Sequence, residues 1–129
     1  MSGLLNGAPI GDVVGQVYSP TGELLTVQRA SINASVIGDN TLVGATPDKK
    51  IYVLSLWLVC SSAVGVRFES GAGGTALTGV MSFPINGGMV LPFNPYGWIA
   101  TLADNTLLNL ELSIAGSSTV SGALQYVTF

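Results

Sequence analysis

Histidine is absent from the 129 residues of this chain, and charged residues make up only 9% of them. Without histidine there is no Ser-His-Asp arrangement, no histidine-based metal site and no imidazole acid or base. The four Lys and Arg residues are too few to neutralise a phosphate backbone, so we expect no direct contact with nucleic acid. We therefore expect no enzyme, no catalytic residues, no cofactor and no metal, but a protein that acts by fitting against other protein.

Long apolar runs and paired cysteines are also missing. Cys60 is the only cysteine, so no disulfide forms within the chain, and at the end of an apolar segment it is expected to be buried and inert. The longest apolar run, residues 51–60, is about half the length of a membrane-spanning helix. The first ten residues lack the basic start and continuous apolar stretch of a signal peptide. The sequence therefore predicts a protein kept soluble in a cytoplasm, with no membrane partner.

The chain has more apolar residues than a small isolated domain usually exposes to water. Hydrophobic residues make up 48% of it and the mean hydropathy is +0.57, whereas about a quarter of the residues in a small soluble monomer are charged. Self-association or docking on a larger assembly is the simplest way to cover such an excess.

Apolar side chains recur with a period of two, which is typical of half-buried strands. In residues 64–69 the apolar side chains share one face while Arg67 and Glu69 share the other, and residues 108–114 alternate in the same way with Glu111 facing outward. Turn residues separate such segments at short intervals, and residues 19–22 indicate a hairpin. We predict an all-β chain, an antiparallel β-sandwich of jelly-roll type over residues 31–129, preceded by an extended amino-terminal arm or hairpin over residues 1–30.

Residues 51–60 differ from these segments because both faces are apolar. Ile51, Val53, Trp57 and Val59 would line one face of such a strand and Tyr52, Leu54, Leu56, Leu58 and Cys60 the other. A strand of this kind is central in its sheet and covered on both sides, by a second sheet together with a partner chain, by an arm of the same chain, or wholly within one sandwich. The candidate interface residues on this strand are Tyr52, Leu54, Leu56 and Leu58.

Two aromatic residues beside Pro95 complete the set of interface candidates. Tyr96 and Trp98 either anchor their strand against the sandwich or form a platform for a partner protein or a sugar ring. The first eleven residues have few side chains suited to a core, and we expect them to form an arm that lies on a neighbouring subunit.

Other patterns have an ordinary structural interpretation that outweighs a chemical one. Glu69 and Glu111 are the nearest approach to a catalytic carboxylate pair, but each fits a solvated strand face. The glycine-rich residues 71–74 are not followed by lysine, which favours a flexible loop over a phosphate cradle. Asp39 and Asp104 are each followed by Asn and Thr, a pattern that supplies calcium ligands in some proteins and Asx turns in more.

Residues 77–98 contain a paired-glycine turn, a Leu-Pro step and an Asn-Pro approach to an aromatic residue, and residues 105–110 and 120–126 extend the pattern. Over residues 51–126 this pattern resembles small β-rich virion proteins of tailed bacteriophages, notably capsid decoration (cement) proteins. The resemblance implies a homotrimer of jelly-roll subunits, made in the host cytoplasm and bound to the capsid exterior. It would bridge neighbouring major capsid proteins and stabilise the head. The alternative is a tail or fibre adhesion module that binds a cell-surface glycan through Tyr96, Trp98 and Asn94.

Overall fold

The computed structural model describes residues 16–113 and 118–129, and every strand pairing within them is antiparallel. The strands are β1 (Val17–Tyr18), β2 (Leu24–Leu25), β3 (Gln28–Ala34), β4 (Gly38–Val43), β5 (Ile51–Cys60), β6 (Val64–Ser70), β7 (Thr75–Ala76), β8 (Met81–Phe83), β9 (Gly88–Leu91), β10 (Ile99–Ala100), β11 (Leu108–Ser113) and β12 (Val120–Thr128).

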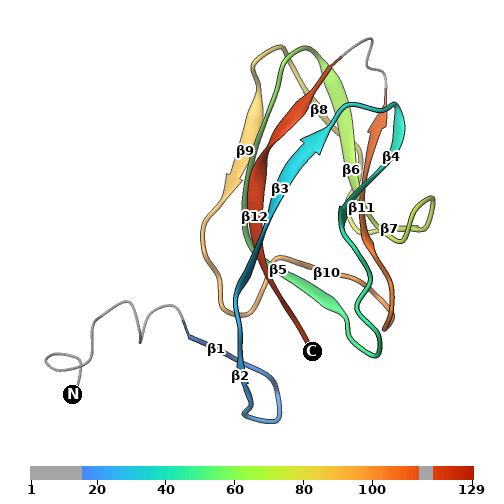
Figure 1. Ribbon diagram of the computed structural model, residues 1–129. Coiled ribbons are helices and arrows are strands. Elements are labelled where there is room, and N and C mark those ends of the chain that lie inside the picture. The colour runs from blue at the N-terminus through green and yellow to red at the C-terminus, as the bar shows by residue number, and fades with distance from the viewer. Residues whose placement is uncertain (1–15, 114–117) are drawn as a thin grey trace, which may run out of the picture.

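Ten of these strands form two five-stranded sheets packed face to face, as Figure 1 shows. Sheet I has the order β10-β5-β12-β3, with β9 also paired to β5, and sheet II has the order β4-β11-β6-β7, with β8 also paired to β6. The remaining pair, β1 and β2, is a separate hairpin below sheet I in this view. The prediction of an antiparallel β-sandwich is therefore confirmed.

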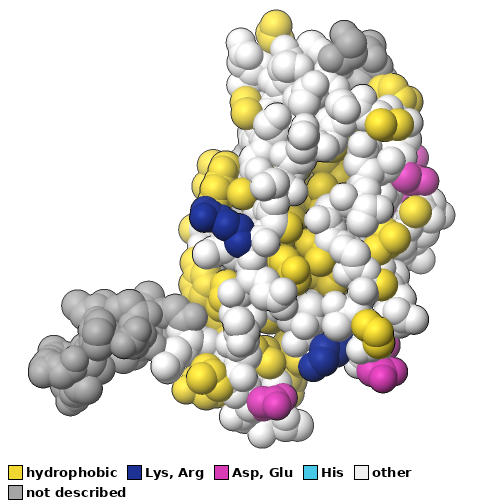
Figure 2. Space-filling view, viewed as in Figure 1, with side chains coloured by type: hydrophobic (Ala, Val, Ile, Leu, Met, Phe, Trp, Pro, Cys, Tyr) yellow, Lys and Arg dark blue, Asp and Glu magenta, His cyan; other side chains and the backbone are white. Residues whose placement is uncertain are grey.

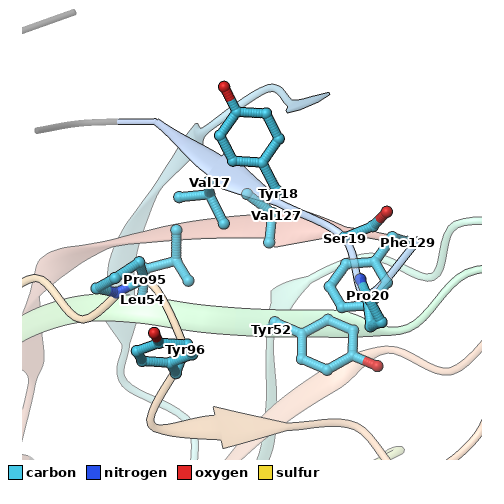
Figure 3. A pocket seen from close by; sticks show the side chains of 10 residues that line it. All are labelled: Val17, Tyr18, Ser19, Pro20, Tyr52, Leu54, Pro95, Tyr96, Val127 and Phe129. Carbon is cyan, nitrogen blue, oxygen red and sulfur yellow. The ribbon is translucent and has the colours of Figure 1, made fainter. Parts of the chain in front are cut away.

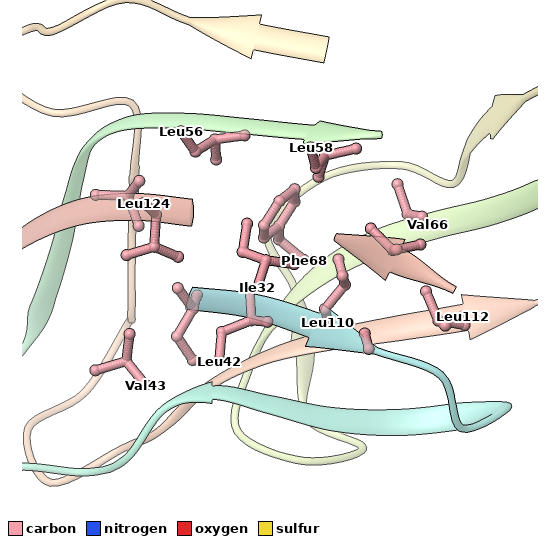
Figure 4. Packing of buried hydrophobic residues seen from close by; sticks show 14 of the residues in the cluster. Ile32, Leu42, Val43, Leu56, Leu58, Val66, Phe68, Leu110, Leu112 and Leu124 are labelled. Carbon is pink, nitrogen blue, oxygen red and sulfur yellow. The ribbon is translucent and has the colours of Figure 1, made fainter. Parts of the chain in front are cut away.

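The core lies between the two sheets and is made by the alternation of their strands (Figure 4). From sheet II, β6 supplies Val64, Val66 and Phe68, each almost fully buried, as the alternation predicted. Leucines of β11 extend the same layer, and β12 of sheet I contributes Leu124. Burial of each such side chain is worth roughly 1.5 to 3 kcal/mol, so this layer supplies most of the hydrophobic stabilisation of the sandwich.

β5 is central in sheet I, as predicted, but its two faces differ from the prediction. Ile51 and Val53 point into the core in the first half of the strand, and Leu56, Leu58 and Cys60 do so in the second half. The pairing with β12 shifts register between Gln125 and Tyr126, which makes Leu54 an extra residue of β5. Because a bulge of one residue moves the following side chains to the opposite face, strict alternation placed Leu56 and Leu58 on the wrong side.

The β1–β2 hairpin covers the first half of the outer face of sheet I. Its turn closes with Gly22 at φ 88°, a left-handed conformation that glycine adopts without strain, and the Gly22 amide donates to the Ser19 carbonyl at 2.9 Å. Val17 of β1 packs on Leu54 and Val127 in a second apolar cluster, separate from the core. The chain thus covers part of this face with its own hairpin, while residues 1–15 of the predicted arm lie outside the described residues.

Candidate docking groove

The space beside the hairpin forms a groove of about 430 Å³ between β1, the outer face of sheet I and the segment that follows β9 (Figure 3). We call it the aromatic groove. Its lining residues are Val17, Tyr18, Ser19, Pro20, Tyr52, Leu54, Pro95, Tyr96, Val127 and Phe129. None of their side chains is charged at neutral pH, so the side chains of the groove suit apolar and aromatic groups.

The floor of the aromatic groove is a stacked pair of aromatic rings. Tyr52 of β5 and Phe129 stack with their ring centroids 4.1 Å apart and their planes at 5°. Phe129 is held in turn by two backbone hydrogen bonds with Lys50, of 3.0 Å and 3.2 Å. Rings fixed in this way offer flat apolar contact area without a large loss of side-chain freedom on binding.

Tyr96 projects from a tight turn at the edge of the groove. The Tyr96 amide donates to the Asn94 side-chain oxygen at 3.0 Å, and the Gly97 amide donates to the Asn94 carbonyl at 2.9 Å. Gly97 has φ 85°, which a residue with a side chain rarely adopts. This turn leaves the Tyr96 side chain 92% exposed, so its ring contributes almost nothing to the packing of its own domain.

Trp98 lies on the other side of Tyr96, at a second hollow of about 210 Å³ that the two residues share with Tyr52. Its indole Nε1 donates to the Pro92 carbonyl at 2.7 Å, which fixes the ring against its own segment while leaving part of it exposed. Trp98 is therefore anchored to its own segment with part of its ring exposed, and its role as a contact surface stays a prediction.

The structure brings four of the six candidate interface residues together at one end of sheet I: Tyr52, Leu54, Tyr96 and Trp98. Leu56 and Leu58 lie between the sheets and are almost fully buried. Sequence reasoning missed Val127 and Phe129, which line the groove from the end of the chain. Val127 and Phe129 are separated by Thr128, and this alternation of apolar and polar residues is the signal in the sequence that could have identified them.

Asn94 was considered as a sugar ligand beside the aromatic pair, but its side chain is used locally. Its oxygen accepts the Tyr96 amide, and its amide nitrogen donates to the Gly97 carbonyl at 3.4 Å. These two bonds orient the amide within the turn and leave one of its two N–H hydrogens for a ligand.

Glu69 and Glu111 meet on the outer face of sheet II, where Arg67 joins both carboxylates. Glu69 was expected to be solvated but is fully buried, because Arg67 and Asn109 close over it. Asn109 also donates to Asp39 at 2.9 Å, which links β4 to this network. A carboxylate pair bridged by a guanidinium has no room for a sugar between its members, so the arrangement is a structural tie between strands.

Burial raises the pKa of Glu69, but its hydrogen bonds with Arg67, Glu111 and Asn109 outweigh burial and hold that pKa below its ordinary value. Glu111 shows the opposite shift: its hydrogen bond with Glu69, followed by desolvation, raises its pKa. The same carboxylates raise the pKa of Arg67, mainly through the hydrogen bond to Glu69.

Within residues 16–113 and 118–129, no three Cys, Asp or Glu side chains are grouped so as to hold a metal ion. No helix in this part of the chain is long and apolar enough to cross a membrane. No protein-family model matches the chain, and no curated protein matches it either.

Proposed function

We propose that this protein is a structural virion protein of a tailed bacteriophage, a capsid decoration (cement) protein that trimerises and bridges major capsid proteins. The observation that carries the docking role is Tyr96, which stands 92% exposed at the edge of an uncharged aromatic groove. Exposed aromatic anchors beside an apolar pocket are the usual centres of protein interfaces. The resemblance of residues 51–126 to decoration proteins supports the capsid as the partner.

The arrangement of the strands supports the jelly-roll part of this proposal. The first strand of the sandwich, β3, lies beside the last, β12, and successive long strands β3, β4, β5 and β6 alternate between sheet I and sheet II. In a jelly roll the chain passes between two sheets in this way, so that first and last strands become neighbours.

The mechanism of such a protein is additive burial. Each docked copy gains contact area on two neighbouring capsid proteins, and because it binds only the assembled shell it shifts the equilibrium toward that shell. Three linked copies bind together more tightly than one, since the second and third contacts are intramolecular. The face in Figure 2 has few charged side chains, and such a face is suited to contacts that depend on shape and apolar area rather than on ion pairs.

The test measures mass in solution by light scattering and co-sedimentation with phage heads that lack decoration protein. We expect a trimer that sediments with heads, and Tyr96→Ala should weaken head binding by about tenfold or more while the unfolding midpoint stays unchanged. Leu102→Ala is the matched control, because Leu102 is 58% exposed but does not line the groove.

A monomer that ignores heads would contradict the proposal, as would a Tyr96→Ala variant that binds them as well as the parent chain does. Binding to a glycan array that Trp98→Ala abolishes would instead support the adhesion module.

A further inference from the structure

The second half of the outer face of sheet I carries an apolar patch that the hairpin does not cover. Trp57 and Val59 of β5 are 41% and 48% exposed, and Val90 of β9 is 73% exposed. Val90 and Ala123 are the cross-strand partners of Trp57 on either side. These four residues form one continuous surface, here called the Trp57 patch.

The Trp57 patch continues a surface that the chain already covers with its own amino-terminal part. The hairpin cluster of Val17, Leu54 and Val127 lies on the same face of the same sheet. Trp57 is three residues beyond Leu54 on β5, a distance of about 10 Å along a strand. The described residues therefore begin on the same face of sheet I as the patch.

We propose that residues 1–15 of the same chain lie across the Trp57 patch and extend the cover that the hairpin begins. These residues are long enough, since fifteen extended residues reach about 50 Å. They are also apolar enough: their large apolar side chains are Met1, Leu4, Leu5, Ile10, Val13 and Val14. Docked on the patch, they would bury it against side chains of matching chemistry.

Charge complementarity supports this segment as the occupant of the patch. The guanidinium carbon of Arg29 lies 5.5 Å from the centroid of the Trp57 ring. Among the described residues, no carboxylate lies within ion-pair distance of Arg29. Asp12 is the one charged side chain in residues 1–15 and precedes Gln16 by four positions. An extended chain places Asp12 within about 13 Å of Gln16. Arg29 is opposite Gln125 of β12, two positions along the strand from Val127, which packs on Val17.

The same chain is a better source of this segment than a neighbouring subunit. Because the segment is joined to a hairpin already seated on this face, its local concentration there exceeds that of any separate copy. The sequence-based expectation placed the arm on a neighbour, so the proposal differs from it on this point. It does not depend on the proposed function, because the aromatic groove and the Trp57 patch share no residue.

The first test uses Trp57 as a fluorescent reporter in the full chain with Trp98→Phe. If residues 1–15 cover the patch, acrylamide should quench Trp57 weakly, and Leu5→Asp with Ile10→Asp should raise the quenching constant about threefold by placing carboxylates on an apolar surface. Leu102→Asp is the control for an added charge at an exposed apolar site. Equal quenching in the parent and the Leu5→Asp, Ile10→Asp variant would overturn the proposal.

The second test keeps Trp98 and maps the contact directly. In Arg29→Lys, a zero-length carbodiimide should join the Asp12 carboxylate to the new amine with loss of one water, and peptide mapping of the monomer identifies the link. Asp12→Asn in the same background should lose it. Absence of a link between residues 12 and 29 would overturn the proposal. A link found only between isotopically distinct chains would also overturn it and assign the patch to a neighbouring subunit.

Discussion

Phe129 stacks on Tyr52 in a nearly parallel arrangement that ties the end of the chain to the centre of sheet I. Such a pair is worth about 0.5 to 1.5 kcal/mol beyond the area that it buries. We therefore expect Phe129→Ala to lower the free energy of unfolding by about 1 to 2 kcal/mol. It should also loosen the hairpin, because Leu25 and Val27 pack in the same cluster. Urea unfolding, with amide hydrogen exchange at residues 17–27, measures both effects.

Phe129→Leu is the control that separates stacking from burial, since leucine keeps most of the apolar volume and loses the parallel ring. It should retain hairpin protection and lose only part of the stability. If hydrogen exchange in the hairpin is unchanged in Phe129→Ala, the aromatic floor does not hold the hairpin in place.

The bulge in β5 predicts opposite outcomes for two neighbouring residues. Leu58 is almost fully buried between the sheets, whereas Val59 is on the outer face. Leu58→Ala should cost about 2 to 5 kcal/mol in the free energy of unfolding, because it leaves a cavity in the core. Val59→Ala should cost less than about 1 kcal/mol. Comparable losses in the two variants, measured by urea unfolding, would contradict the assigned faces.

The sequence predicted the strands whose alternation is regular and failed where one residue interrupts it. In β6, Val66 and Phe68 point inward as the period of two requires, because β6 pairs in regular register with β11. In β5 the extra residue Leu54 reverses the pattern, and a bulge leaves no mark in a run where every residue except Ser55 is apolar.

The candidate site was predictable only in part, for a similar physical reason. Tyr96 and Trp98 were visible as aromatic residues beside a proline, and both lie where a partner can reach them. Val17 and Phe129 come from opposite ends of the chain and meet only in the fold. Glu69 alternates with apolar residues, which is typical of the exposed face of a strand. It is nevertheless buried, because Asn109, which closes over it, is on another strand.

Gly122 allows β12 to approach β5 closely. A β-carbon at Gly122 would collide with the backbone carbonyl of Trp57, and backbone cannot move aside as a flexible side chain can. Gly122→Ala should therefore separate the two central strands of sheet I and cost about 3 kcal/mol or more. Gly44→Ala is the matched control, because nothing lies within 4 Å of a β-carbon there. Thermal unfolding of both variants tests this, and equal midpoints would show that the sheet accommodates the added methyl group.

The shared network of Arg67, Glu69 and Glu111 links stability to pH in two opposed ways. The pKa of Glu69 is lowered in the folded state, so its contribution is present above the ordinary glutamate pKa and is lost as pH falls through the lowered value. The pKa of Glu111 is raised, so its contribution is present below the ordinary value and is lost as pH rises through the raised one.

Glu111→Gln should remove the second of these effects and leave the first. The parent chain is expected to lose stability as pH rises from the ordinary glutamate pKa through the raised pKa of Glu111. Above that range ionised Glu111 faces ionised Glu69, and only the Arg67 guanidinium lies between the two charges. Glutamine carries no charge and can still accept from Arg67, so the variant should lack this decline. Urea unfolding between about pH 4 and pH 8 measures this decline in the free energy of unfolding.

The control is Glu23→Gln, which removes an exposed carboxylate outside the network and should keep the parent slope of unfolding free energy against pH. A Glu111→Gln variant with that same slope would mean that the two carboxylates do not share their charge.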